Sequence, residues 1–228
     1  MAAARALNST SSTGWFEPAL PMRTLAIECA TEACSAALFE DGVLLAGAFE
    51  VIGRGHAERL VPMIAELPGR GRADRILVSL GPGSFTGVRV GLAAARGLAL
   101  AWRVECLGYP TLALVAAMAR AQQPGQPVTV CMSGGHGEWF IQDFGPEGVP
   151  TEALASMTPS EAHRYGNHKV MAGSKAREKA DLAEPSHVVL DILPDARHAL
   201  LVPQVLVTAD LAPIYGRAPD ARPSGTRP

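Results

Sequence analysis

The sequence predicts an α/β fold in which a mixed β-sheet carries helices on its faces. Two observations lead to this class: short β-prone segments open the chain, and from residue 56 onward apolar segments of helix length alternate with segments of strand length. The expected order is three antiparallel strands, helix, strand, helix, strand, helix, which is typical of a mixed sheet with flanking helices. At 228 residues, 48% hydrophobic and 18% charged, the chain can bury a substantial core.

The first three strands are expected as a meander. Thr24–Ile27 and Ser35–Phe39 are short and β-prone, and Asp41-Gly42 is a tight-turn dipeptide that leads into Val43–Phe49. A helix should follow over His56–Leu67, where apolar residues recur at helical spacing. Pro62 removes one hydrogen bond from this helix and should bend it.

The next elements alternate between strand and helix. Ile76–Leu80 has the apolar pattern of a strand buried on both faces, and a glycine-rich turn follows it. A long helix should then begin with Thr86 as its N-cap and end near Trp102. Val104–Leu107 and Thr111–Arg120 are predicted as the following strand and helix.

The chain is expected to divide into two lobes, because residues 122–127 are rich in Pro, Gly and Gln. Residues 22–121 would form the first lobe and 122–217 a smaller second lobe, with a disordered extension or an upstream start over 1–21 and a loose tail over 218–228. The second lobe is predicted to contain a hairpin of Val128–Met132 and Trp139–Phe144 around Ser133-Gly134-Gly135, a strand at Lys169–Ala172, and a helix at Asp195–Val202 stopped by Pro203.

Composition excludes several classes of protein. The net charge is -2 and the 20 Lys and Arg residues are scattered, so the basic stripe of a dedicated nucleic-acid binder is missing. The longest apolar stretch, Val88–Trp102, contains Arg89 and Arg96 and does not predict a membrane span. The four cysteines form no C-x-x-C pair, which favours buried thiols in a reducing compartment and a cytoplasmic protein.

The segment Gly81–Arg89, with the sequence GPGSFTGVR, carries the clearest functional signal. A glycine-rich turn between strand and helix directs backbone N–H groups toward an anion, which makes Gly81 and Gly83 candidate phosphate-binding residues. The segment lacks the Lys of a P-loop and the third Gly of the dinucleotide fingerprint. The alternative is that these glycines only shape a sharp turn.

Glu28 and Thr31 lie where the first strand meets its turn. In nucleotide-using folds such a junction holds a phosphate loop, so both residues are candidate cofactor-binding residues. The alternative for Glu28 is a solvated carboxylate at the end of a strand. The six histidines show no paired spacing on one helix face and no G-x-S-x-G elbow is present, so neither a metal site nor a catalytic residue is assigned.

Small residues form a strip along the second helix. Gly87, Gly91, Ala94 or Ala95, and Leu98 recur at a spacing of three to four residues, which would allow another helix to approach closely. Packing of this strip against the chain's own sheet is the alternative.

Together these segments resemble the TsaB family, whose members help to make threonylcarbamoyladenosine in tRNA. The resemblance rests on Met22–Ile27 with Thr31–Ser35, on His56–Ile64, on Gly108–Thr111 and above all on Gly81–Arg89. The second lobe matches more loosely: Ser133-Gly134-Gly135 replace the usual D-A-R, while Pro194–Arg197 and Pro213–Tyr215 with Arg217 look like later family signatures. The first strand has Glu28 where the family generally has Asp.

The resemblance implies an actin-like fold of two lobes with a reduced second lobe. The catalytic paralogue, TsaD, carries an H-x-x-x-H metal motif, whereas the corresponding helix here, Thr111–Met118, has no His. The resemblance therefore implies a non-catalytic subunit without a cofactor, which activates a TsaD-type partner and meets tRNA only through the complex. ATP and a divalent metal would be bound by the partner subunits, which include a TsaE-type ATPase.

The resemblance also implies a helix-to-helix contact with TsaD, and the same surface could form a homodimer in isolation. The residues expected there are His56, Leu60, Ile64, Gly87, Val88, Gly91, Ala94, Ala95 and Leu98. The main alternative function is an independent ATP-binding or ATP-hydrolysing enzyme of the actin-like fold. A peptidase, a name attached to relatives of this group, is a more distant alternative because no nucleophile triad can be nominated.

Overall fold

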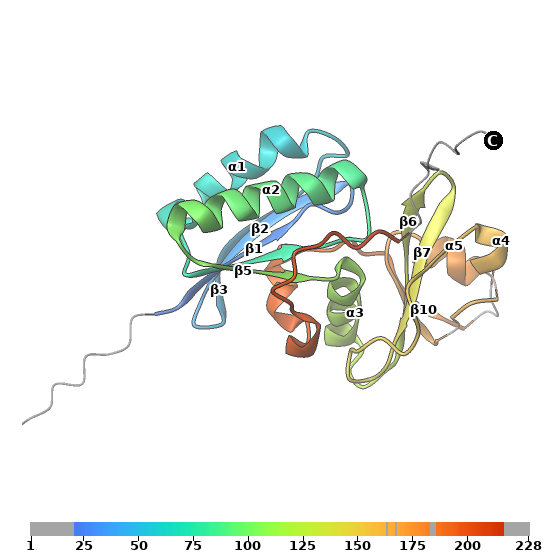
Figure 1. Ribbon diagram of the computed structural model, residues 1–228. Helices are drawn as coiled ribbons and strands as arrows, with labels where there is room; N and C mark the ends of the chain where they lie inside the picture. The colour runs from blue at the N-terminus through green and yellow to red at the C-terminus, as the bar shows by residue number, and fades with distance from the viewer. Residues whose placement is uncertain (1–20, 163, 167, 183–185, 217–228) are drawn as a thin grey trace, which may run out of the picture.

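The computed structural model describes residues 21–162, 164–166, 168–182 and 186–216. The chain forms two five-stranded sheets with helices packed against them (Figure 1). Except for Pro21, the expected extension over residues 1–21 lies outside the described residues, as does the expected tail over 218–228. None of the helices in the described ranges is long and apolar enough to cross a membrane.

The first sheet is mixed, as the sequence predicts. Its strands are β1 (Arg23–Glu28), β2 (Ala33–Glu40), β3 (Val43–Val51), β4 (Arg75–Ser79) and β5 (Glu105–Tyr109), in the order β3-β2-β1-β4-β5. Strands β1 to β3 pair antiparallel, while β1, β4 and β5 run parallel. Asp41 and Gly42 make the β2–β3 turn with φ values of 48° and 82°, a conformation that favours an Asp-Gly pair.

Helices cover both faces of the first sheet. α1 (His56–Glu66) and α2 (Phe85–Trp102) pack on one face, where a continuous apolar core forms beneath them. α1 runs through Pro62, which lies on its exposed side. α3 (Thr111–Gln122) lies on the opposite face between the two sheets, so residues 111–119 are all buried (Figure 1). A short 3-10 turn, η1 (Pro68–Gly71), links α1 to β4.

The second sheet has the order β10-β9-β6-β7-β8. The predicted hairpin exists, but its turn was misplaced: Ser133-Gly134-Gly135 belong to the first strand, and the turn lies at His136 and Gly137, both of which have positive φ. The elements of this lobe are β6 (Val128–Gly135), β7 (Glu138–Phe144), β8 (Ala155–Met157), α4 (Pro159–Ala162), β9 (Val170–Ala172), α5 (Ala176–Asp181) and β10 (Val188–Leu190).

After β10 the chain returns to the first sheet. The segment predicted as a helix over 195–202 is a 3-10 helix, η2 (Ala196–Leu201), followed by η3 (Gln204–Leu206). η2 packs against α3 and strands β1 to β3, and the Ala196 amide donates to Ser35 Oγ at 3.0 Å. Further along, the Ile214 amide donates to the Leu80 carbonyl at 2.8 Å. Residues 195–214 therefore complete the first lobe, although they follow the second in sequence.

The four cysteines are free thiols. Cys29, Cys34 and Cys131 are buried, and Cys106 is half-buried. The Sγ atoms of Cys29 and Cys34 lie 3.6 Å apart across the β1–β2 turn. The expectation of buried thiols therefore holds for three of the four.

The N-cap of α2 is Ser84 and not Thr86. Ser84 Oγ accepts a hydrogen bond from the Gly87 amide at 3.2 Å, and the helix begins at Phe85. Ser84→Ala should lower the free energy of unfolding by about 1 kcal/mol, because one amide of the first turn loses its acceptor. Thr86→Ala, an exposed change within the same turn, is the matched control, and equal losses for both variants in urea titrations would contradict this assignment.

Candidate functional site: the cleft between the two sheets

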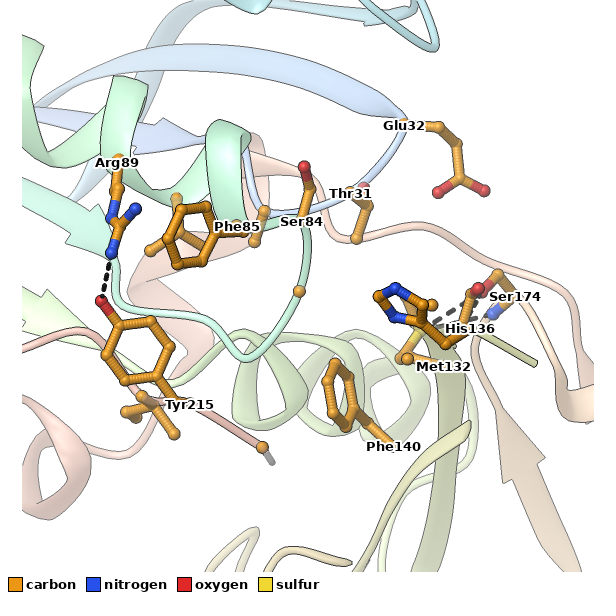
Figure 2. A pocket seen from close by; sticks show the side chains of 18 of the residues that line it. Thr31, Glu32, Ser84, Phe85, Arg89, Met132, His136, Phe140, Ser174 and Tyr215 are labelled. Atoms are coloured by element: carbon orange, nitrogen blue, oxygen red, sulfur yellow. Dashed lines mark hydrogen bonds between the residues drawn. The ribbon is translucent and has the colours of Figure 1, made fainter. Parts of the chain in front are cut away.

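A cleft of about 800 Å³ lies between the two lobes (Figure 2). One wall comes from the β1–β2 turn and the start of α2, and the other from the β6–β7 hairpin. Residues 214–216, from the returning C-terminal segment, close one side. Every wall is therefore built by this chain, from segments distant in sequence.

An aromatic and cationic group occupies one wall. The Arg89 guanidinium carbon lies 3.2 Å from the centroid of the Phe85 ring, and Arg89 Nη2 donates to the Tyr215 hydroxyl at 3.1 Å. The Phe85 and Tyr215 rings lie 6.2 Å apart. Within the described residues Arg89 forms no ion pair with a carboxylate. Stacking on Phe85 and the bond to Tyr215 fix the orientation of this uncompensated positive charge.

The opposite wall is apolar with a polar edge. Phe140 from β7 and Met132 from β6 are buried beneath it, with Met132 Sδ accepting from the Ser174 amide at 3.3 Å. Ser174 Oγ in turn accepts from the Ser133 amide at 3.2 Å. Figure 2 shows Phe140, Met132 and Ser174 on the side of the cleft away from Arg89. These contacts hold the strand end in place, and the exposed residues of this wall are Ser133, Gly135 and His136.

The turns that would hold a phosphate in an actin-like fold are bonded within the chain. The Ala30 amide donates to Glu28 Oε1 at 2.7 Å, and the Ala33 amide donates to Thr31 Oγ1 at 3.2 Å. The Ser84 amide donates to the Ala30 carbonyl at 2.6 Å. Gly83 packs so tightly there that a Cβ would collide with the Ala30 carbonyl. The glycine-rich turn thus serves close packing of two loops, the alternative left open by the sequence.

Glu28 is fully buried, so the expectation of a solvated carboxylate is wrong. Its Oε2 atom has no hydrogen-bond partner among the described residues. Burial raises the pKa of Glu28 to about 7, against the lowering effect of the Ala30 amide. Among the four candidate cofactor-binding residues, Thr31 and Gly83 line the cleft, whereas Glu28 and Gly81 lie behind it. Within the described ranges no group of three His, Cys, Asp or Glu residues is arranged to hold a metal ion.

Most of the residues expected at a partner helix face inward instead. A Cβ on Gly91 would contact Cys29, Val78 and Ile27 at 3.5–3.8 Å, and one on Gly87 would collide with the Cys29 carbonyl. Ala94 and Leu98 remain partly exposed. The following residues are buried within this chain, and their contact with a partner stays a prediction: His56, Leu60, Ile64, Gly87, Val88, Gly91 and Ala95.

The outward side of the same two helices is also apolar. Val61 on α1 is 55% exposed and Leu100 on α2 is 82% exposed. Ala93 and Gly97 are also exposed on α2, and a Cβ on Gly97 would meet no atom within 4 Å. We call Val61, Ala93, Gly97 and Leu100 the outer helix face. The small-residue strip available to a partner is thus rotated around α2 from the one expected.

Comparison with known proteins gives the family. The family model described as tRNA N6-adenosine threonylcarbamoyltransferase, TsaD, matches residues 50–162. The tRNA threonylcarbamoyladenosine biosynthesis protein TsaB of Escherichia coli (strain K12) is 31% identical over 222 residues, which cover 86% of this chain and 95% of that protein. The chain belongs to the TsaB family. The TsaB protein of Haemophilus influenzae is 30% identical and is covered to 92% of its length.

A solved structure agrees with this TsaB-family assignment and with the fold. The structure titled "YeaZ from Pseudomonas aeruginosa" superposes with a TM-score of 0.72 at 28% identity, over 85% of this chain and 99% of that one. The expected α/β fold, with two mixed sheets and flanking helices, is thereby confirmed.

Several cleft residues escaped the sequence analysis. Phe85 and Arg89 belong to the GPGSFTGVR segment, but only its glycines were predicted to have a binding role. Tyr215 falls in a segment that resembles a family signature, but nothing local indicated that it would reach Arg89. Phe140 reads as an ordinary strand residue. The return of the C-terminal segment to the first lobe brings Tyr215 to Arg89, and the packing of the two lobes adds Phe140.

Proposed function

We propose that this TsaB-family chain is a non-catalytic subunit that binds and activates a TsaD-type transferase, which forms threonylcarbamoyladenosine next to the anticodon of tRNA. The observation that carries the proposal is the apolar outer helix face on α1 and α2. Exposed apolar residues grouped on one helix side can mark protein interfaces, and the alanine and glycine here allow close approach of another helix.

The names of the relatives support a role in the biosynthesis of threonylcarbamoyladenosine in tRNA. The curated proteins from E. coli and H. influenzae are named for threonylcarbamoyladenosine biosynthesis. The match of residues 50–162 to the TsaD family indicates a paralogous relationship, and paralogous subunits often associate through equivalent surfaces. Ala94 and Leu98, partly exposed beside the outer helix face, would lie at its edge. In isolation the same face could join two copies of the chain.

A non-catalytic role is supported by the helix that corresponds to the TsaD metal motif. In α3, residues 111–119 are buried between the sheets and include no histidine. The Ala30 and Ala33 amides at the β1–β2 turn are bonded within the chain, which removes two donors that an independent ATP-using enzyme could use at that loop. In the proposed complex, located in the cytoplasm, ATP and a divalent metal belong to the TsaD-type and TsaE-type partners, and tRNA meets this chain through them.

Reconstitution tests the proposal. The chain would be combined with the TsaD and TsaE proteins of the same organism, tRNA and threonylcarbamoyl-adenylate, and modified adenosine would be quantified. We expect the modification to depend on the chain. Ala93→Glu should weaken binding to TsaD about tenfold or more, because it places a charge in a desolvated contact. Ala121→Glu, an exposed alanine at the end of α3, is the matched control.

Three outcomes would contradict the proposal. Modification independent of the chain would remove the activating role, and ATP turnover by the chain alone would favour the independent enzyme. Equal effects of the Ala93 and Ala121 substitutions would exclude the outer helix face as the contact. A bulky substitution at Gly91 is unsuitable here, because Gly91 packs against the chain's own sheet and its replacement would test folding.

A further inference from the structure

The proposed contact with a TsaD-type partner does not use the interlobe cleft. It lies at the start of α2, on the side that faces the second lobe, whereas the outer helix face points away from the sheet. Its volume of about 800 Å³ falls within the range of small-molecule sites. An inference about this cleft is thus independent of the proposed function and can be tested on the isolated chain.

Two aromatic side chains are exposed to water inside the cleft, which is unfavourable in free energy unless a ligand covers them. Phe85 is 59% exposed and Tyr215 is 54% exposed, although both line a concave surface. Phe140 and Met132 lie in the opposite wall but are only 5% and 3% exposed. The two exposed rings, on one wall with their centroids 6.2 Å apart, are suited to a flat apolar ligand that packs against them.

The charges of the cleft restrict the ligand further. Arg89 is held in place by Phe85 and Tyr215 and lacks an ion-pair partner among the described residues, so it can receive one anionic group. Glu32 lines the same cleft and would repel a polyanion. The amides that could cradle a polyphosphate at Ala30 and Ser84 are already bonded within the chain. The cleft therefore favours a single negative charge over a triphosphate.

We propose that the cleft binds a planar aromatic small molecule that carries one negative charge. Its ring packs against the exposed rings of Phe85 and Tyr215, and its acidic group pairs with the Arg89 guanidinium. Arg89 is then a specificity-determining residue that selects acids over neutral analogues of the same shape. Phe85 contributes ring contact and also orients Arg89.

The test uses 1-naphthoate as the probe, its neutral amide 1-naphthamide, and ATP, each titrated into the isolated chain by calorimetry. We expect 1-naphthoate to bind with a dissociation constant below about 1 mM, as suits a ligand of its size. The amide and ATP should bind about tenfold more weakly or not at all. Arg89→Gln should remove the preference for the acid, and Phe85→Ala should weaken both naphthalene probes, while the thermal melting of the variants stays close to that of the parent.

The control is Arg177→Gln, which removes an exposed arginine from α5 and should leave probe binding unchanged. Equal affinity for the acid and the amide, with no effect of Arg89→Gln, would overturn the proposal and indicate unspecific apolar binding. Tighter binding of ATP than of 1-naphthoate would overturn it in favour of a nucleotide site. Absence of binding by all three probes would also overturn it. None of these outcomes bears on activation of a TsaD partner.

Discussion

Gly87→Ala is expected to lower the free energy of unfolding by about 2–3 kcal/mol, although alanine is the better helix former. The reason is steric: a Cβ at this position would collide with the backbone carbonyl of Cys29, which cannot move without displacing the β1–β2 turn. Chemical denaturation of the isolated chain measures the change. A loss of this size would establish that the glycine is required for packing of α2 on the first sheet.

Gly97→Ala provides the matched control, because it makes the same change in the same helix. A Cβ at Gly97 would meet no atom within 4 Å, so this variant should gain about 0.5–1 kcal/mol from helix propensity. The opposite signs of the two changes form the prediction. If both variants gained stability, α2 would have to lie farther from the β1–β2 turn than the structure places it.

Glu28→Gln is expected to stabilise the protein at pH 8 and to remove a pH dependence of its stability. The folded state raises the pKa of Glu28 to about 7, above the usual value of 4.5, so the native protein holds a proton that the unfolded chain releases. Stability due to this group is therefore present below about pH 4.5 and is lost as the pH rises to about 7. A shift of this size corresponds to about 3 kcal/mol.

Denaturant titrations of both proteins between pH 4.5 and pH 8 measure this effect. The difference in the free energy of unfolding should grow with pH in favour of Glu28→Gln, since a neutral amide has no charge to desolvate. Glu147→Gln, which removes a carboxylate from an exposed turn, is the control for the loss of a surface charge. A difference that did not change with pH would show that Glu28 remains ionised in the folded protein, with a counter-charge or water to support it.

The first lobe could be predicted from the sequence because its signals are local. The Asp41-Gly42 turn, the apolar run before Gly81 and the helical spacing after His56 each fix an element without reference to the rest of the chain. The family resemblance added the two-lobe arrangement. The second lobe was harder to place, because its short strands β8 and β10 are defined by pairing with their neighbours.

The candidate site was predicted only in part, for a related reason. Spacing along α2 identifies a strip of small residues but not the direction in which the strip points, and a buried helix face and a partner-binding face can have the same composition. Gly91 and Gly97 differ only in what lies opposite them. Likewise, Arg89 and Tyr215 are 126 residues apart, and their contact follows from the path of the chain back across the first lobe.

That return path also affects the order in which the protein can fold during synthesis. The face of the first sheet that carries α3 is also covered by η2, whose residues are translated after those of the second sheet. Until then, β1 to β3 expose apolar surface that the nascent chain cannot yet bury, even though their own strands have long been translated. The second lobe, an insertion within the first, therefore has the opportunity to form before the first is complete.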